Sequence, residues 1–180
     1  APRNKLIDFP NLEASTFANT LVVGRSTTIR KLYHYTGIDP LTGIYQFEDV
    51  NKDGKLDIND RTIIKDIGMR WDGSIQNSFQ YGRWKLQFLV QVINQNLTNS
   101  KSNATSLGSM GNLPIQYLDY WTPDNLNATY QKPTTLANAA LTTAAVNFTN
   151  SDAVISNAWY VRLRNVSLQY DIPADLLKVM

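Results

Sequence analysis

The sequence predicts an all-β protein of antiparallel strands with the length and alternation typical of transmembrane β-barrel strands. Three observations support this prediction. Apolar and polar residues alternate along three segments of about eight to thirteen residues. The connections between these segments are very unequal in length, since one has two residues and others are long. Asn and Thr are abundant, while charged residues make up only 18% and aromatic residues 11% of the chain, a balance that favours an exterior β-protein over a cytosolic helical enzyme.

The clearest strand covers residues 84–93. The apolar residues on one of its faces are Trp84, Leu86, Phe88, Val90 and Val92. The opposite face carries the polar residues Lys85, Gln87 and Gln91, with Leu89 as an exception. Ten residues are about what a tilted strand needs to cross a membrane.

A second strand, residues 74–81, precedes the first and forms a hairpin with it. Ile75, Phe79 and Tyr81 alternate there with polar residues. Only Gly82-Arg83 separates the two strands, and Gly readily adopts the positive φ of a two-residue turn. The spacing therefore predicts a tight antiparallel hairpin.

A third strand is expected over residues 158–170. Its apolar positions are Trp159, Val161 and Leu163 before Asn165, and Val166, Leu168 and Tyr170 after it. A β-bulge near Arg164-Asn165 would bring both sets to one face, because an extra residue restores the register. Pro173, which has no N–H to donate, ends the strand.

A fourth strand is expected over residues 29–36, and two long connections, 37–71 and 94–157, remain. Short turns on one side and long loops on the other are typical of outer-membrane barrels, whose long loops face outward. Both connections are therefore predicted to be extracellular. The second should contain a helix that Asn112 caps, with an apolar face formed by Ile115, Tyr117, Leu118 and Trp121.

The first long connection contains a segment that matches a calcium-binding loop. Residues 49–60 read Asp-Val-Asn-Lys-Asp-Gly-Lys-Leu-Asp-Ile-Asn-Asp, with Gly54 at the sharp turn of the twelve-residue EF-hand pattern. The candidate ligands are Asp49, Asn51, Asp53, the backbone carbonyl of Lys55, Asp57 and Asp60. We expect calcium as a structural cofactor, because no nucleophile or general base is patterned nearby.

Two features separate this loop from an EF-hand. Asp60 stands where an EF-hand has a bidentate Glu, and no helix pair flanks the loop, although residues 58–64 could form a short helical turn. The alternative interpretation is a solvated turn rich in Asp, Asn and Gly that needs no metal.

The sequence does not predict an enzyme. His34 is the only histidine, and no partner residues are patterned around it. The chain has no cysteine, which excludes thiol catalysis and a zinc-thiolate site. Trp84 and Trp159 are expected in the aromatic girdle of a barrel, and Trp121 either binds a ligand or packs against its own loop.

The charge balance bears on nucleic acid as a partner. The formal net charge is only +2, from 17 basic and 15 acidic residues that are scattered along the chain. Nucleic-acid binding is therefore not indicated. No apolar run of about 18 residues is present, so no transmembrane helix is expected.

Several further segments stand out in the sequence. They are Phe9-Pro-Asn-Leu-Glu, Thr20-Leu-Val-Val-Gly24, Tyr35-Thr-Gly-Ile-Asp-Pro-Leu-Thr-Gly43, Tyr45-Gln-Phe-Glu-Asp-Val-Asn-Lys-Asp-Gly54, Asp60-Arg-Thr-Ile-Ile64, Trp121-Thr-Pro-Asp-Asn125 and Ala158-Trp-Tyr-Val-Arg-Leu-Arg-Asn-Val-Ser-Leu-Gln-Tyr170. In family order and over most of the chain, these segments resemble the SusC/RagA-type TonB-dependent transporters of Gram-negative outer membranes. Any one of these segments is weak alone, and the ordered set is more specific.

The resemblance implies a membrane protein, a large barrel of about 22 strands in the bacterial outer membrane. Such a barrel takes up nutrients, either oligosaccharides or peptides, with energy from TonB and with a SusD-like surface lipoprotein as partner. Residues 1–180 would then be a partial, C-terminal portion of the barrel. The plug and the TonB-contacting segment have no counterpart, and the chain stops at Asp175–Met180, before the family's last strands.

A second function stays open at this stage. A secreted, calcium-stabilised β-sandwich that binds glycans or acts as an adhesin would bury the apolar stripe of residues 84–92 against another sheet. A membrane barrel would instead leave this stripe facing lipid.

Overall fold

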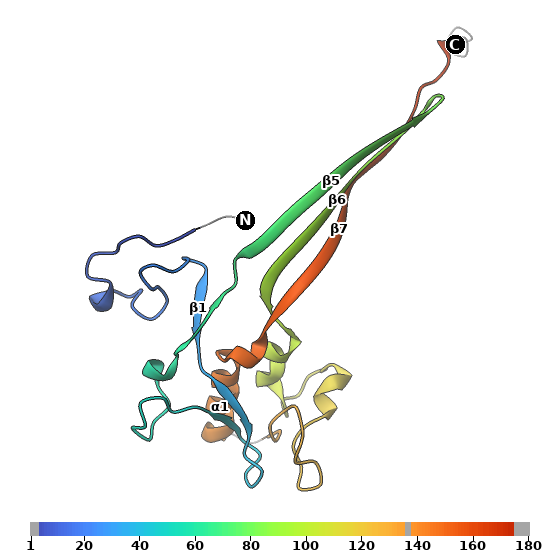
Figure 1. Ribbon diagram of the computed structural model, residues 1–180. Coiled ribbons are helices and arrows are strands. Elements are labelled where there is room, and N and C mark those ends of the chain that lie inside the picture. The colour runs from blue at the N-terminus through green and yellow to red at the C-terminus, as the bar shows by residue number, and fades with distance from the viewer. Residues whose placement is uncertain (1–3, 136–137, 175–180) are drawn as a thin grey trace. The chain divides into compact units, whose positions relative to one another are not determined.

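The computed structural model describes residues 4–135 and 138–174 (Figure 1). This part of the chain contains seven β-strands, one α-helix and five short 3-10 helices. It divides into two compact units. The sheet unit comprises residues 69–95 and 157–174, and the mixed unit comprises residues 4–68 and 96–156. Residues 175–180, beyond which the resemblance expects further strands, lie outside the described residues.

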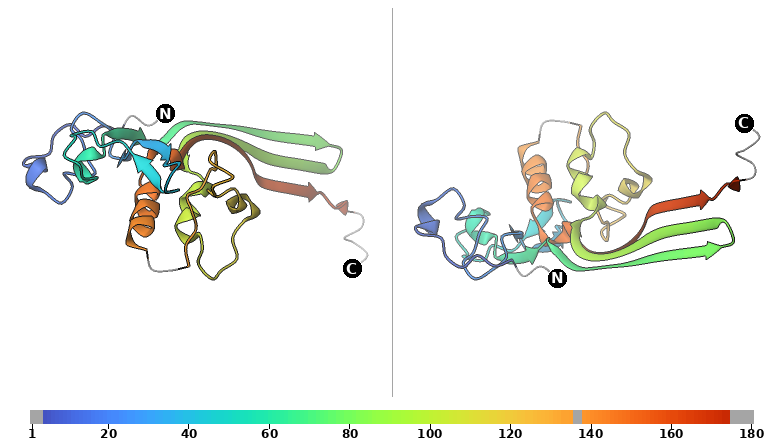
Figure 2. Two further views of the ribbon diagram at one scale, coloured as in Figure 1. Left: turned by 90° about the horizontal axis from the view of Figure 1, so that it is seen from below. Right: turned by 90° about the horizontal axis from the view of Figure 1, so that it is seen from above.

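Three long neighbouring strands form the sheet unit, in the order β5–β6–β7 (Figures 1 and 2). They are β5 (Met69–Tyr81), β6 (Trp84–Thr98) and β7 (Ile155–Tyr170). Strands β5 and β6 are antiparallel, and Tyr81 pairs with Trp84 across a turn where Gly82 has a φ of 56°. The predicted two-residue hairpin is therefore confirmed.

Each strand of this sheet is longer than alternation alone predicted. β5 begins five residues before residue 74, β6 ends five residues after residue 93, and β7 begins three residues before residue 158. The additional residues break the simple apolar pattern, but their backbone groups still pair. β7 ends at Tyr170, ahead of Pro173, as expected. Asn165 has a φ of 51°, which fits the bulge predicted at this position.

Two small antiparallel sheets lie in the mixed unit, and they correct one prediction. Strand β1 (Ile29–Leu32) pairs with β4 (Ile63–Asp66), whereas β2 (Tyr35–Ile38) pairs with β3 (Tyr45–Phe47). The single strand expected over residues 29–36 is thus divided between two sheets. The division falls at Tyr33, whose N–H donates to Asn150 and whose carbonyl accepts from Asp152.

The helix expected after Asn112 is also corrected. Only a 3-10 turn, η4 (Ile115–Leu118), forms there. Tyr117 is buried, but Ile115 is 83% exposed and does not share its environment. An α-helix forms instead further along the chain, α1 (Ala139–Thr149), and the Asn138 side chain accepts a hydrogen bond from the Leu141 N–H at its start.

The remaining 3-10 helices of the described residues are η1 (Leu12–Ala14), η2 (Ile58–Asp60), η3 (Ser100–Ser106) and η5 (Asp152–Val154). η2 corresponds to the helical turn expected within residues 58–64, and β4 follows it. None of the helices in the described part of the chain is long and apolar enough to cross a membrane.

An aromatic core holds the mixed unit together. The rings of Tyr45 and Phe148 are stacked with their centroids 4.1 Å apart, and Tyr35 meets both rings edge-on. Burial raises the pKa of Tyr35 to about 12. The same core includes Ala104, Tyr117, Tyr130, Ala144 and Val154. Segments of the two long connections therefore pack together around a shared core and are not isolated loops.

A close contact joins the two connections elsewhere in this unit. Gly43 has a φ of 74°, and a Cβ atom at this position would lie 2.4 Å from the ring of Trp121. Its carbonyl accepts a hydrogen bond from the N–H of Lys132. Only glycine satisfies both the backbone conformation and the contact.

The prediction of a β-rich, antiparallel protein is confirmed, with one α-helix added. The described strands form two sheets of two strands and one of three, and none of these sheets closes on itself. A transmembrane barrel and its size stay predictions.

Candidate functional site

The two faces of the sheet unit differ in chemistry, and the strand register shows why. Phe79 lies opposite Leu86, and Ile75 lies opposite Val90, so these apolar residues share one face. Ser78 opposite Gln87 and Ser74 opposite Gln91 belong to the other face. Because side chains alternate along each strand, the pairing separates an apolar face from a polar one, as the alternation predicted.

Large side chains on the apolar face are exposed within the described chain. The exposed fraction is 66% for Ile75, 65% for Trp159 and 68% for Val161. Further exposed members are Phe79, Tyr81, Trp84, Leu163, Val166, Leu168 and Tyr170. A continuous apolar surface of this kind indicates a membrane, a partner or a second sheet that covers it.

Aromatic pairs mark both ends of this face. The rings of Trp71 and Trp159 lie 5.8 Å apart near one end, and those of Trp84 and Tyr170 lie 4.7 Å apart at the hairpin end. From Trp71 to Tyr81 a strand rises about 33 Å. If the strands were tilted by about 40°, as barrel strands are, this length would make a band about 25 Å tall.

The polar face carries amides, hydroxyls and cations. Gln91 donates from Nε2 to Asp72 at 2.9 Å, and Gln87 donates from Nε2 to the Ser78 hydroxyl at 3.4 Å. Beside them, Gln76, Gln87, Asn165 and Ser167 contribute to the lining of a hollow of about 290 Å³. Lys85, Arg162 and Arg164 occupy the same face by the alternation of their strands.

The predicted calcium loop is a compact series of hydrogen-bonded turns. Asp49 accepts from the N–H groups of Lys52 at 2.7 Å and Gly54 at 2.9 Å. Asp53 accepts from the N–H of Lys55 at 2.8 Å, and Asn51 donates from its amide to the other Asp53 oxygen at 3.0 Å. Lys52 and Gly54 both have positive φ, which turns the chain sharply.

The last two predicted ligands, Asp57 and Asp60, have a different local role. Asp60 has no exposed surface, and its carboxylate accepts from the N–H groups of Val50 at 2.9 Å and Asp57 at 2.8 Å. The Asp57 side chain accepts from the Asn59 N–H at 2.7 Å and from the Asp60 N–H, and the bond from Asp60 completes a capping box around η2. The hydrogen bond from the Asp57 N–H is the main cause that lowers the pKa of Asp60.

The donor set of this loop fits calcium in kind. Asp49, Asn51 and Asp53 present side-chain oxygens within one turn of chain, and each oxygen bonded to an N–H keeps a further lone pair. Lys55 lies in the same loop, where its carbonyl is the expected ligand. Within the described residues, however, no group of three or more His, Asp or Glu side chains is already arranged to hold a metal ion.

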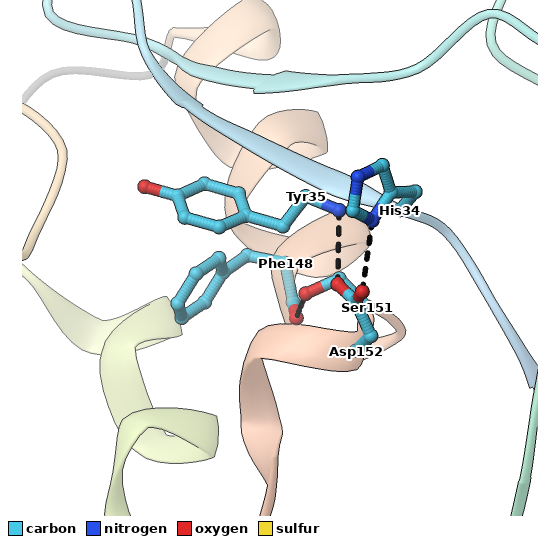
Figure 3. Close-up of polar contacts among 5 residues, drawn as sticks. All are labelled: His34, Tyr35, Phe148, Ser151 and Asp152. Carbon is cyan, nitrogen blue, oxygen red and sulfur yellow. Dashed lines mark hydrogen bonds and ion pairs between the residues drawn. The ribbon is translucent and has the colours of Figure 1, made fainter.

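His34 has a partner that sequence analysis missed. It lies between β1 and β2, and its Nδ1 atom is 2.9 Å from Oδ2 of Asp152 (Figure 3). The adjacent Ser151 hydroxyl donates instead to the carbonyl of Phe148 at 2.7 Å. A histidine, an acid and a serine thus gather without the serine–histidine hydrogen bond that activates a nucleophile. This geometry favours a structural role for His34.

Trp121 is buried rather than displayed to solvent. It is 7% exposed, and its backbone N–H donates to Tyr130 at 2.8 Å. Its indole Nε1 atom has no hydrogen-bond partner among the described residues. Of the two roles considered for Trp121, packing agrees with this burial, but the ring lies against Gly43 of the other long connection and not only against its own loop.

Comparison with protein-family models and with curated proteins finds no match for the chain.

Proposed function

We propose that the chain is part of a TonB-dependent importer of nutrients in the bacterial outer membrane. The observation that carries this proposal is the apolar face of the sheet unit, with an aromatic pair at each end. A lipid bilayer is the environment that matches a band of this height and leaves the opposite face polar. The resemblance to SusC/RagA-type transporters supports the same function.

The edges of the sheet support the proposal that further strands complete the structure. β6 has a neighbour on each side, while β5 and β7 each have one neighbour among the described strands. Unpaired backbone groups are not tolerated in lipid, so both edges would pair with further strands of a large barrel. The plug and the TonB-contacting segment would lie outside residues 1–180.

The mixed unit would lie on the extracellular side and meet a SusD-like lipoprotein, with an oligosaccharide or peptide as cargo. Its own aromatic core supports a rigid surface rather than a set of flexible loops. Calcium would add a structural constraint to the loop of residues 49–60. No catalytic residue is needed, because the energy for transport enters through TonB.

A secreted β-sandwich that binds glycans is the alternative function. The mixed unit favours it in one respect, since this unit has a buried core independent of the sheet unit. In that protein a second sheet, rather than lipid, would cover the apolar face.

Solubility distinguishes the two functions. We expect the protein to fractionate with outer membranes and to require detergent for a monodisperse state. A monomeric protein that stays in solution without detergent would exclude the importer. Collisional quenching of tryptophan fluorescence by brominated lipid adds a direct readout, because Trp84 and Trp159 would lie at the membrane interface.

A further inference from the structure

The polar face of the sheet unit carries an excess of positive charge. Arg162 and Arg164 lie two residues apart on β7, and Lys85 lies on the same face of β6. None of these three cations forms an ion pair within the described residues. The acid that shares this face in the described strands is Asp72, whose Oδ1 atom accepts a hydrogen bond from Gln91.

A hollow lies on the polar face that carries these cations. The hollow has a volume of about 290 Å³, and its lining combines four polar residues, Gln76, Gln87, Asn165 and Ser167, with three apolar ones, Phe88, Leu89 and Val166. Arg164 directly precedes Asn165. Lys85 precedes Gln87 by two residues, a separation of about 7 Å along a strand. Amide and hydroxyl groups here can donate to and accept from the hydroxyls of a sugar.

The side chain of Arg162, which is farther along β7 from the hollow than Arg164, has a defined position. The guanidinium of Arg162 lies 4.6 Å from the centroid of the Tyr160 ring. A cation that stacks on an aromatic ring keeps its N–H groups available at its edge. A guanidinium held in this way loses less conformational entropy when it pairs with a carboxylate or sulfate.

We propose that this polar face binds an acidic carbohydrate. Hydroxyls of the sugar would bond to the amides and hydroxyl of the hollow, while Lys85, Arg162 and Arg164 pair with its carboxylate or sulfate groups. The inference rests on the proposed function, because the face lines an aqueous lumen only when the barrel is complete. It narrows the cargo from nutrients in general to anionic sugars.

The test is a calorimetric titration of the complete protein that contains this chain, purified in detergent. The probes are galacturonic acid oligomers and neutral galactose oligomers of equal length. We expect the acidic oligomers to bind about tenfold more tightly, as three partly solvated ion pairs allow. The preference should decrease as salt is added. Equal affinity for both probes, or a preference that does not depend on salt, would overturn the proposal.

Matched variants assign the effect to this face. The triple variant Lys85→Gln, Arg162→Gln, Arg164→Gln should lose the preference for acidic oligomers and keep its affinity for neutral ones. Arg83→Gln removes one positive charge from the hairpin turn, outside the polar face, and should retain the preference. A triple variant that binds like the wild type would contradict the assignment. If this variant does not fold, the salt dependence of the wild type's preference for acidic oligomers still tests the proposal.

The two proposals fail in different ways. A protein that requires detergent but shows no preference for acidic oligomers overturns the acidic-ligand proposal alone. A water-soluble monomer overturns the importer, and with it the luminal role of the polar face.

Discussion

His34 and Asp152 are 118 residues apart in sequence, yet Nδ1 of His34 lies 2.9 Å from Oδ2 of Asp152. The other Asp152 oxygen accepts a hydrogen bond from the N–H of Tyr35 at 3.0 Å (Figure 3). One carboxylate therefore connects the segment between β1 and β2 with the segment that follows α1. Both segments belong to the mixed unit.

The first prediction concerns pH. The hydrogen bond to Asp152 raises the pKa of His34 above its usual value of 6.5, burial acts in the opposite direction, and the charges of Asp152 and Glu48 raise it further. Because the folded pKa is the higher one, this pair stabilises the fold fully below about pH 6.5. The contribution is lost as pH rises through the folded pKa. Urea unfolding measures the free energy of unfolding of wild type and His34→Gln at pH values below 6.5 and above the folded pKa of His34. We expect the wild type to be the more stable protein at the lower pH and to lose this advantage as pH rises.

The control for this pair is Asp152→Asn, which retains an oxygen that can accept from Tyr35. We expect the pKa of His34 to fall toward about 6.5 in this variant. NMR can follow the titration without ambiguity, since the chain has one histidine. An unchanged titration midpoint would show that Asp152 does not control His34.

The second prediction concerns Asp60, which bonds to two backbone N–H groups that lie ten and three residues before it. Asp60→Ala leaves both donors without a partner, so we expect the melting temperature to fall by about 5 °C or more. Asp60→Asn should cost less, because its amide oxygen can still accept one bond. Asp39→Ala, which removes a carboxylate that caps an exposed turn, is the control. Equal effects at the two positions would contradict the special role of Asp60.

The third prediction concerns calcium. Calcium chloride should raise the melting temperature, and a chelator should reverse the change. At a hundredfold excess over Kd the stabilisation would be about 2.7 kcal/mol. Asp49→Asn and Asp53→Asn should weaken the response, while Asp39→Asn should keep it. If the wild type does not respond to calcium or chelator, the loop is the solvated turn of the alternative interpretation.

The fourth prediction compares neighbouring residues on opposite faces of β5. Ile75→Arg places a charge near the centre of the apolar band and should cost about 2–4 kcal/mol in phospholipid vesicles. Gln76→Arg changes the polar face and should cost much less. Denaturant unfolding of the protein in vesicles measures both variants. Similar losses for the two would argue against contact of the apolar face with lipid.

Local patterns predicted the sheet unit well. The Gly82-Arg83 turn, the two strands that it joins and the irregular position at Asn165 follow from interactions between near neighbours. Alternation underestimated strand length because backbone pairing continues beyond residues 74 and 93, where the side-chain pattern breaks. Backbone hydrogen bonds between strands define the length of a strand, and they form whether or not its side chains alternate regularly.

The mixed unit was predicted less well, because its elements depend on distant partners. Tyr33 divides an apparent strand through bonds to Asn150 and Asp152. The helix α1 was not predicted, although Asn138 is a suitable N-cap and the helix itself is rich in Ala. Phe148 of this helix stacks on Tyr45, which is far away in the sequence. No local pattern indicates such a contact.

The sequence by itself determined the antiparallel β character, the hairpin, the separation of apolar and polar faces, and the spacing of oxygen donors in residues 49–60. Those features depend on the period of the strand and on turn chemistry, which act over a few residues. Only the tertiary structure decided that Asp60 is buried, that His34 meets Asp152 and that the long connections share an aromatic core. The pair of His34 with Asp152 and the aromatic core require contacts between segments far apart in the chain, and such contacts follow from packing rather than from local propensity. The burial of Asp60 depends on how the loop folds back so that the N–H groups of Val50 and Asp57 reach its carboxylate.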